Sequence, residues 1–262
     1  GLYNDYVREN PLCPQRRDVT YMVRTALREG DKVLAESPQS YWLSNATEKH
    51  WRSSTSAQTH AAGVLASMNI NVSNYRIAII NIAKTPADSR VGIGANPSSF
   101  VPQDYFSSTL RVSNLDQLGD ACVDFDSIQK TYFEAVRPNG ILEPVEWKDN
   151  TGTYSISEAM AISSARHFGE KGATTNKPRV TGVFDCVAGW HVNDGQGPYL
   201  SISALDRGDD MDLVGLTVGY VFHNPEGESV TSEGKIYSNG DLIRIGDEYP
   251  CDDVLKYCRP IM

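Results

Sequence analysis

The sequence predicts an α+β fold in which a long N-terminal helix precedes a largely antiparallel β region. Apolar residues recur at helical spacing over residues 18–68. From residue 75 onward, short runs rich in β-branched residues alternate with turn signals such as Asn-Pro and Asn-Gly. The 262 residues, 40% hydrophobic and 22% charged, suffice for one large globular domain or two small ones.

The N-terminal part is expected to be one long helix with a single break. Val19, Met22 and Val23 fall on one face of a helix, and Pro38 interrupts the pattern. The pattern resumes over residues 47–68, which are rich in alanine, serine and charged residues. This helical segment is therefore expected to be the first structural unit of the chain.

The remainder is expected to alternate strands with loops. An aromatic-rich short helix that begins at Tyr132, and a polar turn that closes at Gly152, interrupt this pattern. Residues 84–89 are expected to form a turn, and residues 97–126 and 166–178 to form loops. Strands are expected over residues 75–82, 90–94, 153–162, 179–185, 199–205, 213–223, 229–237 and 241–245.

The charge and motif content excludes several classes of protein. The net charge is -9 and no basic cluster is present, which argues against a nucleic-acid surface. No apolar run reaches the roughly 18 residues that a membrane-spanning helix needs. Histidines are scattered, and no Cys-x-x-Cys pair or phosphate-binding glycine loop is complete. No metal, cofactor or nucleic-acid partner is therefore expected.

The five cysteines suggest an oxidising compartment. Cys251 and Cys258 are close enough in sequence to close a short loop, and Cys122 with Cys186 would tie two segments together, leaving Cys13 unpaired. Five thiols allow many other pairings. This disulfide interpretation favours an extracytoplasmic location, either periplasmic or extracellular.

A candidate ligand pocket lies in the middle of the chain. Aromatic rings supply desolvated contact area in small-molecule sites, and fixed carboxylates orient the ligand. In the alternative interpretation, Tyr132 and Trp147 are core residues and Asp149 only caps a turn. The candidate ligand-binding residues are Lys130, Tyr132, Trp147, Asp149, Tyr154 and Asp185.

This order of residues resembles the membrane-distal module of double Cache sensor domains. The resemblance rests on Tyr132 and Phe133, then Trp147 and Asp149, then Val-Thr-Gly-Val-Phe at residues 180–184. The family's amino-acid-binding members carry an Arg that grips the ligand carboxylate. In this chain a Gln occupies that position, so the resemblance does not specify an amino-acid ligand.

The resemblance implies two PAS-like modules, each built on an antiparallel sheet, behind a helical stalk. The implied divisions are a stalk at residues 1–74, a membrane-distal ligand-binding module at 75–192, and a smaller membrane-proximal β-rich module at 193–262. A shift between two helix arrangements would carry the signal along the stalk.

The function expected from the sequence is that of a small-molecule sensor domain of a membrane signalling receptor, and not that of an enzyme. Its partners would be a small-molecule ligand and, through segments outside this chain, a membrane, and the receptor interpretation is compatible with a homodimer. The alternative is a secreted or pilus-associated adhesion or structural protein. A hydrolase whose site assembles from distant residues is a third interpretation, although no nucleophile and base can be paired from the sequence.

Overall fold

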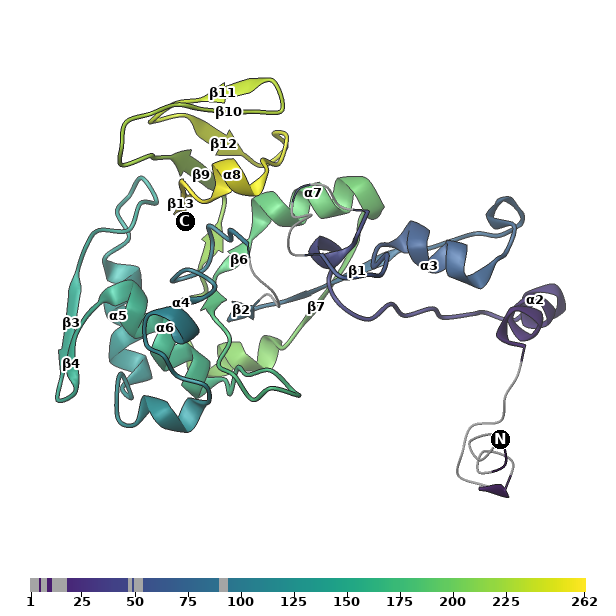
Figure 1. Ribbon diagram of the computed structural model, residues 1–262, viewed down its shortest axis with the longest axis horizontal. Coiled ribbons are helices and arrows are strands. Elements are labelled where there is room, and N and C mark those ends of the chain that lie inside the picture. Colours follow the sequence, from purple (N-terminus) through teal and green to yellow (C-terminus); the bar gives the residue numbers. More distant parts are fainter. Residues whose placement is uncertain (1–4, 6–8, 11–17, 47–48, 50–53, 90–93) are drawn as a thin grey trace.

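The computed structural model describes residues 5, 9–10, 18–46, 49, 54–89 and 94–262. Figure 1 shows a β3–β4 hairpin and helices α5 and α6 at one end of the molecule, with the N-terminal helices α2 and α3 at the other. A parallel pair of strands, β1 and β7, runs between them, and the C-terminal strands lie beside helix α7.

The expected long N-terminal helix is wrong, because the described part of residues 18–68 contains two separate α-helices in its place. Helix α2 spans Val19–Glu29 and ends at Gly30, whose φ of 90° is left-handed. Helix α3 spans Ala61–Met68, begins at the capping side chain of His60 and ends at a left-handed Asn69. Local capping therefore stops each helix after a few turns. The expected helical residues 47–48 and 50–53 lie outside the described residues.

Helices α5 and α6 form the centre of the larger hydrophobic core. Helix α5 spans Phe125–Glu134 and α6 spans Ile156–His167, and α6 is buried on most of its surface. The expected strand over residues 153–162 is wrong beyond residue 155. Ser155 and Glu158 form a reciprocal capping box, which starts α6 directly after the strand. Short helices α4 (Tyr105–Ser108) and η4 (Leu115–Leu118) cover this core.

The strands form small sheets, two of which are parallel pairs. β1 (Ile80–Lys84) pairs with β7 (Tyr199–Ser203) and β6 (Phe184–Asp185) with β8 (Leu216–Thr217), both in parallel. The antiparallel pairs are β2 (Asp88–Ser89) with β5 (Thr181–Gly182), β3 (Glu146–Asp149) with β4 (Gly152–Ser155), and β10 (Val230–Ser232) with β11 (Lys235–Tyr237). The three-stranded sheet has β9 (Gly219–Phe222) between β12 (Leu242–Arg244) and β13 (Cys258–Ile261).

The short connecting helices complete the fold. They are η1 (Tyr41–Leu43), η3 (Val72–Asn74), α7 (Cys186–Gln196), η5 (Leu205–Asp210) and α8 (Asp252–Leu255). A second hydrophobic core lies between α7, α8 and β9, and includes Tyr220, Phe222 and Val254.

The expected pair of PAS-like antiparallel-sheet modules is wrong. Among the described residues the largest sheet has three strands, and a PAS-like module would need about five. Pairing also crosses the expected module boundary at residue 192, since β1 pairs with β7 and β6 with β8. The division at 1–74, 75–192 and 193–262 stays a prediction. The strand expected over residues 90–94 lies almost wholly outside the described residues.

The expected disulfides are absent from the described part of the chain. Cys122, Cys186, Cys251 and Cys258 are all free thiols. Burial raises the pKa of Cys258 to about 12, and its Sγ donates to the Val254 carbonyl oxygen at 3.5 Å. The remaining cysteine, Cys13, lies outside the described residues. The cysteines therefore supply no argument for an oxidising compartment.

Candidate functional site

The carboxyl ends of the parallel strands β1 and β7 form the candidate site. Lys84 ends β1 and Ser203 ends β7. In open α/β sheets, ligands bind outside the carboxyl ends of the parallel strands. Both exits also contain a non-glycine residue in left-handed backbone conformation, Ala87 and Ala204, each with φ 60°. Such strained positions gather at functional sites, where the surrounding structure holds them in place.

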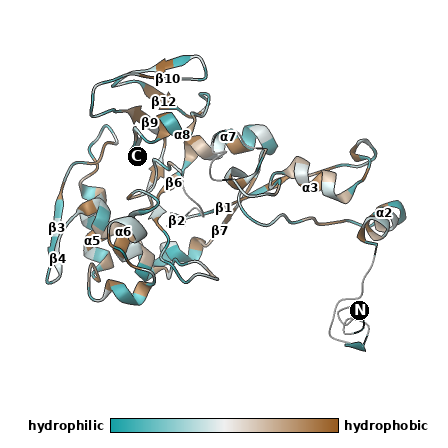
Figure 2. Ribbon diagram, viewed as in Figure 1, coloured by the Kyte–Doolittle hydropathy of each residue, from teal (hydrophilic) through white to brown (hydrophobic). Residues whose placement is uncertain are grey.

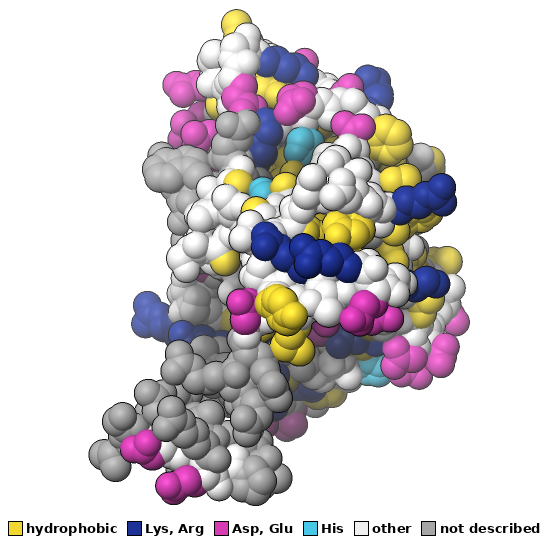
Figure 3. Space-filling view, turned by 90° about the vertical axis from the view of Figure 1, so that its right-hand side faces the viewer, with side chains coloured by type: hydrophobic (Ala, Val, Ile, Leu, Met, Phe, Trp, Pro, Cys, Tyr) yellow, Lys and Arg dark blue, Asp and Glu magenta, His cyan; other side chains and the backbone are white. Residues whose placement is uncertain are grey.

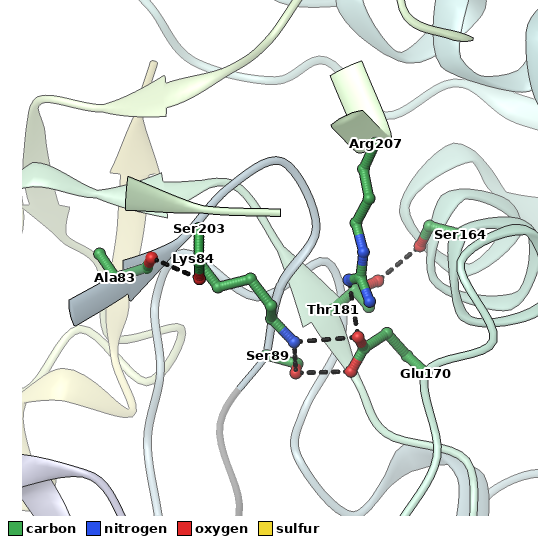
Figure 4. A network of polar contacts seen from close by, with 8 residues as sticks. All are labelled: Ala83, Lys84, Ser89, Ser164, Glu170, Thr181, Ser203 and Arg207. Atoms are coloured by element: carbon green, nitrogen blue, oxygen red, sulfur yellow. Dashed lines mark hydrogen bonds and ion pairs between the residues drawn. The ribbon is translucent and has the colours of Figure 1, made fainter. Parts of the chain in front are cut away.

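The buried carboxylate of Glu170 forms ion pairs with Lys84 at the end of β1 and with Arg207 in the segment after β7 (Figure 4). Its Oε1 lies 2.9 Å from Lys84 Nζ and 2.6 Å from Arg207 Nη1. Its Oε2 accepts from Ser89 Oγ at 2.8 Å, and Ser89 Oγ accepts from Lys84 Nζ at 2.7 Å. The Glu170 side chain is only 6% exposed, whereas those of Lys84 and Arg207 are 25% and 22% exposed. These residues come from β1, β2, the segment after α6, and η5.

The pKa values of two carboxyl groups at this position are shifted in opposite directions. Burial alone would raise the pKa of Glu170, but bonds from Lys84, Ser89 and Arg207 outweigh it and hold that pKa below its ordinary value. Burial raises the pKa of Asp88 to about 6, with the neighbouring charge of Lys84 acting in the other direction. The site therefore holds one firmly ionised carboxylate and one that titrates close to neutral pH.

A cation-rich loop, residues 171–179, follows Glu170 directly. It contains Lys171, Lys177 and Arg179, two threonines and an asparagine, and no acidic residue. The loop folds back on itself, because Gly172 N–H donates to the Lys177 carbonyl at 2.9 Å. The Arg179 N–H donates to the backbone carbonyl of Glu170 at 2.9 Å. The residue whose side chain organises the network thus also fixes the base of the cation-rich loop.

An apolar hollow lies beside the turn after β1. It is narrow, with about 10 Å³ of space for a water-sized molecule, which is no more than one water needs. The Thr85 hydroxyl is buried and has no hydrogen-bond partner among the described residues. The hollow is lined by Thr85, Pro86, Ala87, Phe100, Phe133, Met160, Ser164, Phe168, Gly182, Val183, Met211, Val214 and Gly215.

The six residues expected to bind a ligand are not gathered around this hollow. Tyr132 is buried on α5 against Phe100, with ring centroids 5.0 Å apart, and Lys130 is exposed on the same helix. Trp147 and Tyr154 are register partners on the β3–β4 hairpin, and both pack against the larger core. These four residues belong to α5 and the β3–β4 hairpin, which lie at the same end of the molecule (Figure 1).

The two expected carboxylates accept hydrogen bonds from several groups within the protein. Asp149 accepts hydrogen bonds from the N–H groups of Cys122, Thr151 and Gly152. Burial acts to raise the pKa of Asp149, but the bonds from the Thr151 side chain and from these N–H groups outweigh it and lower the pKa to about 2. Asp185 is buried at the start of α7, and Ser98 Oγ donates to it at 2.6 Å. Asp149 therefore caps its turn and also binds the Cys122 backbone. Asp185 caps the start of α7 and also accepts from the hydroxyl groups of Ser98 and Tyr220. A ligand-binding role for the six residues stays a prediction.

The sequence interpretation missed Lys84, Glu170 and Arg207. Lys84 follows an apolar run of strand length. If that strand had been predicted to be parallel, the position of Lys84 at its carboxyl end would have indicated a candidate site residue. Glu170 lies 86 residues further along the chain, and no local motif connects the two. Only the fold brings them together.

Comparison with known proteins identifies the family. A family model described as adenylosuccinate synthetase matches residues 3–241. The chain is 53% identical over 270 residues to the adenylosuccinate synthetase of Leishmania major and 52% identical over 268 residues to that of Trypanosoma brucei brucei. Each alignment covers 100% of this chain, but 38% and 44% of the respective relatives. The chain thus spans about two fifths of the length of these relatives.

A solved structure shows the same fold at lower identity. It is described as the structure of fully ligated adenylosuccinate synthetase from Plasmodium falciparum, and matches with a TM-score of 0.58 at 15% identity. The match covers 99% of this chain and 43% of that chain.

These matches overturn the resemblance to double Cache sensor domains. The expected receptor and adhesion functions are wrong, and so is the expectation that the chain does not belong to an enzyme, because the matched family is one of synthetases. The expected partners, a sensed ligand and a membrane, and the extracytoplasmic location followed from the receptor interpretation and are wrong with it. No helix in the described ranges has both the length and the apolar character that crossing a bilayer requires.

Proposed function

Because the chain belongs to the adenylosuccinate synthetase family, we propose that it forms part of an enzyme that joins IMP and aspartate at the expense of GTP. The curated relatives extend well beyond the part that this chain matches, so the complete reaction is a property proposed for the whole enzyme. This chain contributes the carboxyl edge of β1 and β7 and the loop beside it.

The cation-rich loop at residues 171–179 carries the proposal. IMP, aspartate and GTP all bear phosphate or carboxylate groups at neutral pH, and such groups bind strongly to Arg and Lys. The loop presents three cations without a neutralising acid of its own. Lys171 and Lys177 are exposed and Arg179 is half-buried. We assign the loop to an anionic group of one of these substrates.

The Glu170 network positions this loop. Lys84 and Arg207 each form an ion pair with the Glu170 carboxylate, so much of their charge is neutralised inside the protein. Their role is therefore to fix Glu170. The backbone carbonyl of Glu170 in turn accepts a hydrogen bond from the Arg179 N–H, which holds the two ends of the loop together. Pre-organised donors bind an anion better than mobile ones, because less conformational entropy is lost on binding.

Titration calorimetry of the full chain with IMP, GTP and aspartate separately tests this assignment. We expect at least one of the three to bind the wild-type chain. Lys177→Gln and Arg179→Gln should each weaken that binding by roughly 10- to 100-fold, the effect of losing one charge-assisted hydrogen bond.

Lys148→Gln is the matched control. Lys148 is 69% exposed on the β3–β4 hairpin, where its Nζ lies 3.3 Å from Glu146, so the variant removes the same charge away from the loop. Its affinity should equal that of the wild type. Absence of binding to the folded wild-type chain, or equal affinities for all variants, would contradict the proposed role of the loop.

A further inference from the structure

The η5 segment, Leu205–Asp210, has little packing of its own. It begins after the left-handed Ala204 without a side-chain cap, and none of its six residues is buried. Its one large apolar side chain, Leu205, is 61% exposed. Segments with few buried apolar contacts open easily unless other contacts hold them. The position of η5 beyond the carboxyl end of β7 therefore depends on polar contacts with its neighbours.

Contacts with helices α5 and α6 fix the end of η5. Gln129 is a buried residue of α5, a helix that carries both hydrophobic and hydrophilic residues (Figure 2). Its Nε2 donates to the Asp210 backbone carbonyl at 3.1 Å. His167, the last residue of α6, lies with its Nε2 3.3 Å from Asp210 Oδ2 and stacks on Phe125 with ring centroids 4.1 Å apart. Asp210 is thus attached to both core helices.

Arg207 fixes the middle of η5 to the segment that leads into the cation-rich loop. Its guanidinium lies 5.5 Å from the centroid of the Phe168 ring, and its Nη1 lies 2.6 Å from Glu170 Oε1 (Figure 4). Side chains of both charges lie at the surface of the molecule (Figure 3), where water and salt weaken ion pairs. Glu170 is only 6% exposed, so its pair with Arg207 is screened less.

Glu170 connects η5 to the cation-rich loop. Its carboxylate contacts Arg207, and its backbone carbonyl accepts from the Arg179 N–H at the far end of the loop at 2.9 Å. Lys171, the first residue of the loop, follows it directly. A displacement of Glu170 therefore alters both segments. When two segments share an anchor in this way, the coupling between them acts equally in both directions.

We propose that Arg207 is a positioning residue that couples η5 to the cation-rich loop through Glu170. An anion bound by the loop fixes Glu170, which holds Arg207 and keeps η5 at the carboxyl end of β7. By the same linkage, a substrate that contacts η5 raises the affinity of the loop for its anion. The part played by the anion rests on the proposed function of the loop, whereas the coupling itself is a property of the ligand-free chain.

Amide hydrogen exchange of the ligand-free chain tests the coupling. Arg207→Gln should speed exchange in residues 205–210 by roughly tenfold, the effect of losing one partly buried ion pair. Exchange in residues 171–179 should rise by roughly threefold, a smaller change because Lys84 still pairs with Glu170. Exchange at β10–β11 should be unchanged, which provides an internal reference. Unchanged exchange in the loop, or an equal rise in all three regions, would overturn the proposal.

Two matched variants separate positioning from the loss of a charge. Arg207→Lys keeps a cation for Glu170 and should restore most of the protection in both segments. Arg137→Gln breaks an ion pair with Glu143 in which the Arg137 side chain is 60% exposed, and should leave both segments as in the wild type. Loop exchange as fast in Arg207→Lys as in Arg207→Gln, or faster exchange in both segments of Arg137→Gln, would contradict coupling through the Arg207 charge.

The same measurement with IMP, GTP or aspartate tests the response to a substrate. A compound that slows exchange in residues 171–179 of the wild type should also slow it in residues 205–210, and in Arg207→Gln it should slow only the loop. Protection of the wild-type loop without η5, or equal protection of η5 in both proteins, would overturn the coupling and leave the proposed function intact. Absence of loop protection with all three compounds would contradict the proposed function, and the ligand-free comparison would still decide the coupling.

Discussion

Replacing Asp88 by Asn should stabilise the protein at neutral pH. Asp88 lies in β2, and burial raises its pKa from 3.8 to about 6; the charge of Lys84 opposes this rise, and those of Asp185 and Glu170 add to it. A group whose pKa is higher in the folded state favours folding below the unfolded pKa. That contribution is lost as the pH rises through the folded value. Above about pH 6, the ionised Asp88 therefore costs stability.

The size of this cost follows from the shift. Roughly two pKa units correspond to about 3 kcal/mol at full effect. Because the Asp88 side chain is only half-buried, water screens part of it, and we expect about 1–2 kcal/mol. The Asn variant keeps the shape and an acceptor oxygen while removing the charge. The gain should be present at pH 7.5 and should fall towards zero as the pH approaches 4.

Urea unfolding at pH 7.5 and at pH 4 measures the effect. Glu226→Gln, at an exposed turn position, is the control, because it removes the same charge without relieving burial. It should change stability by less than about 0.5 kcal/mol at either pH. An Asp88→Asn protein that is less stable at pH 7.5, or equally stabilised at both pH values, would refute the reasoning.

Two further substitutions test the network and the helix that supports it. Glu170→Gln leaves two cations without their carboxylate and should destabilise the protein by about 2–4 kcal/mol in urea unfolding, whereas Glu146→Gln, in an exposed pair, should cost less than about 1 kcal/mol. Equal effects would show that the network contributes no more than a surface pair. Ser155→Ala removes the capping box of α6 and should cost about 1 kcal/mol in the same assay, and the exposed Ser107→Ala should cost little. No loss in the Ser155 variant would mean that packing alone sets the start of α6.

Local structure could be predicted only where the signal is contained in neighbouring residues. The Asn-Pro-Glu-Gly turn forms as expected, since Gly227 N–H donates to the Asn224 carbonyl at 3.0 Å. The start of α6 was missed although its signal is local. The apolar alternation after Thr153 favoured a strand, but the Ser155 and Glu158 capping pair determines the outcome.

Strand partners and the candidate site could not be predicted from the sequence. The apolar run over residues 75–82 overlaps β1 and indicates a strand, but it does not indicate that the partner strand is parallel and begins at Tyr199. Because the strands were predicted to pair in antiparallel fashion, the carboxyl edge of the β1–β7 pair was not recognised, and Lys84 at that edge was overlooked. The aromatic residues at 132 and 147 suit a ligand pocket and a packed core equally well, because both environments require desolvated rings. In the structure they pack in or against the larger core.

The most direct test of the proposed site is to locate substrate contacts by amide hydrogen exchange of this chain with IMP, GTP or aspartate. The proposal predicts slower exchange in residues 171–179 with at least one of these compounds, and none at the β3–β4 hairpin. Protection confined to the region around Trp147, or no change in the loop with any of the three, would contradict it.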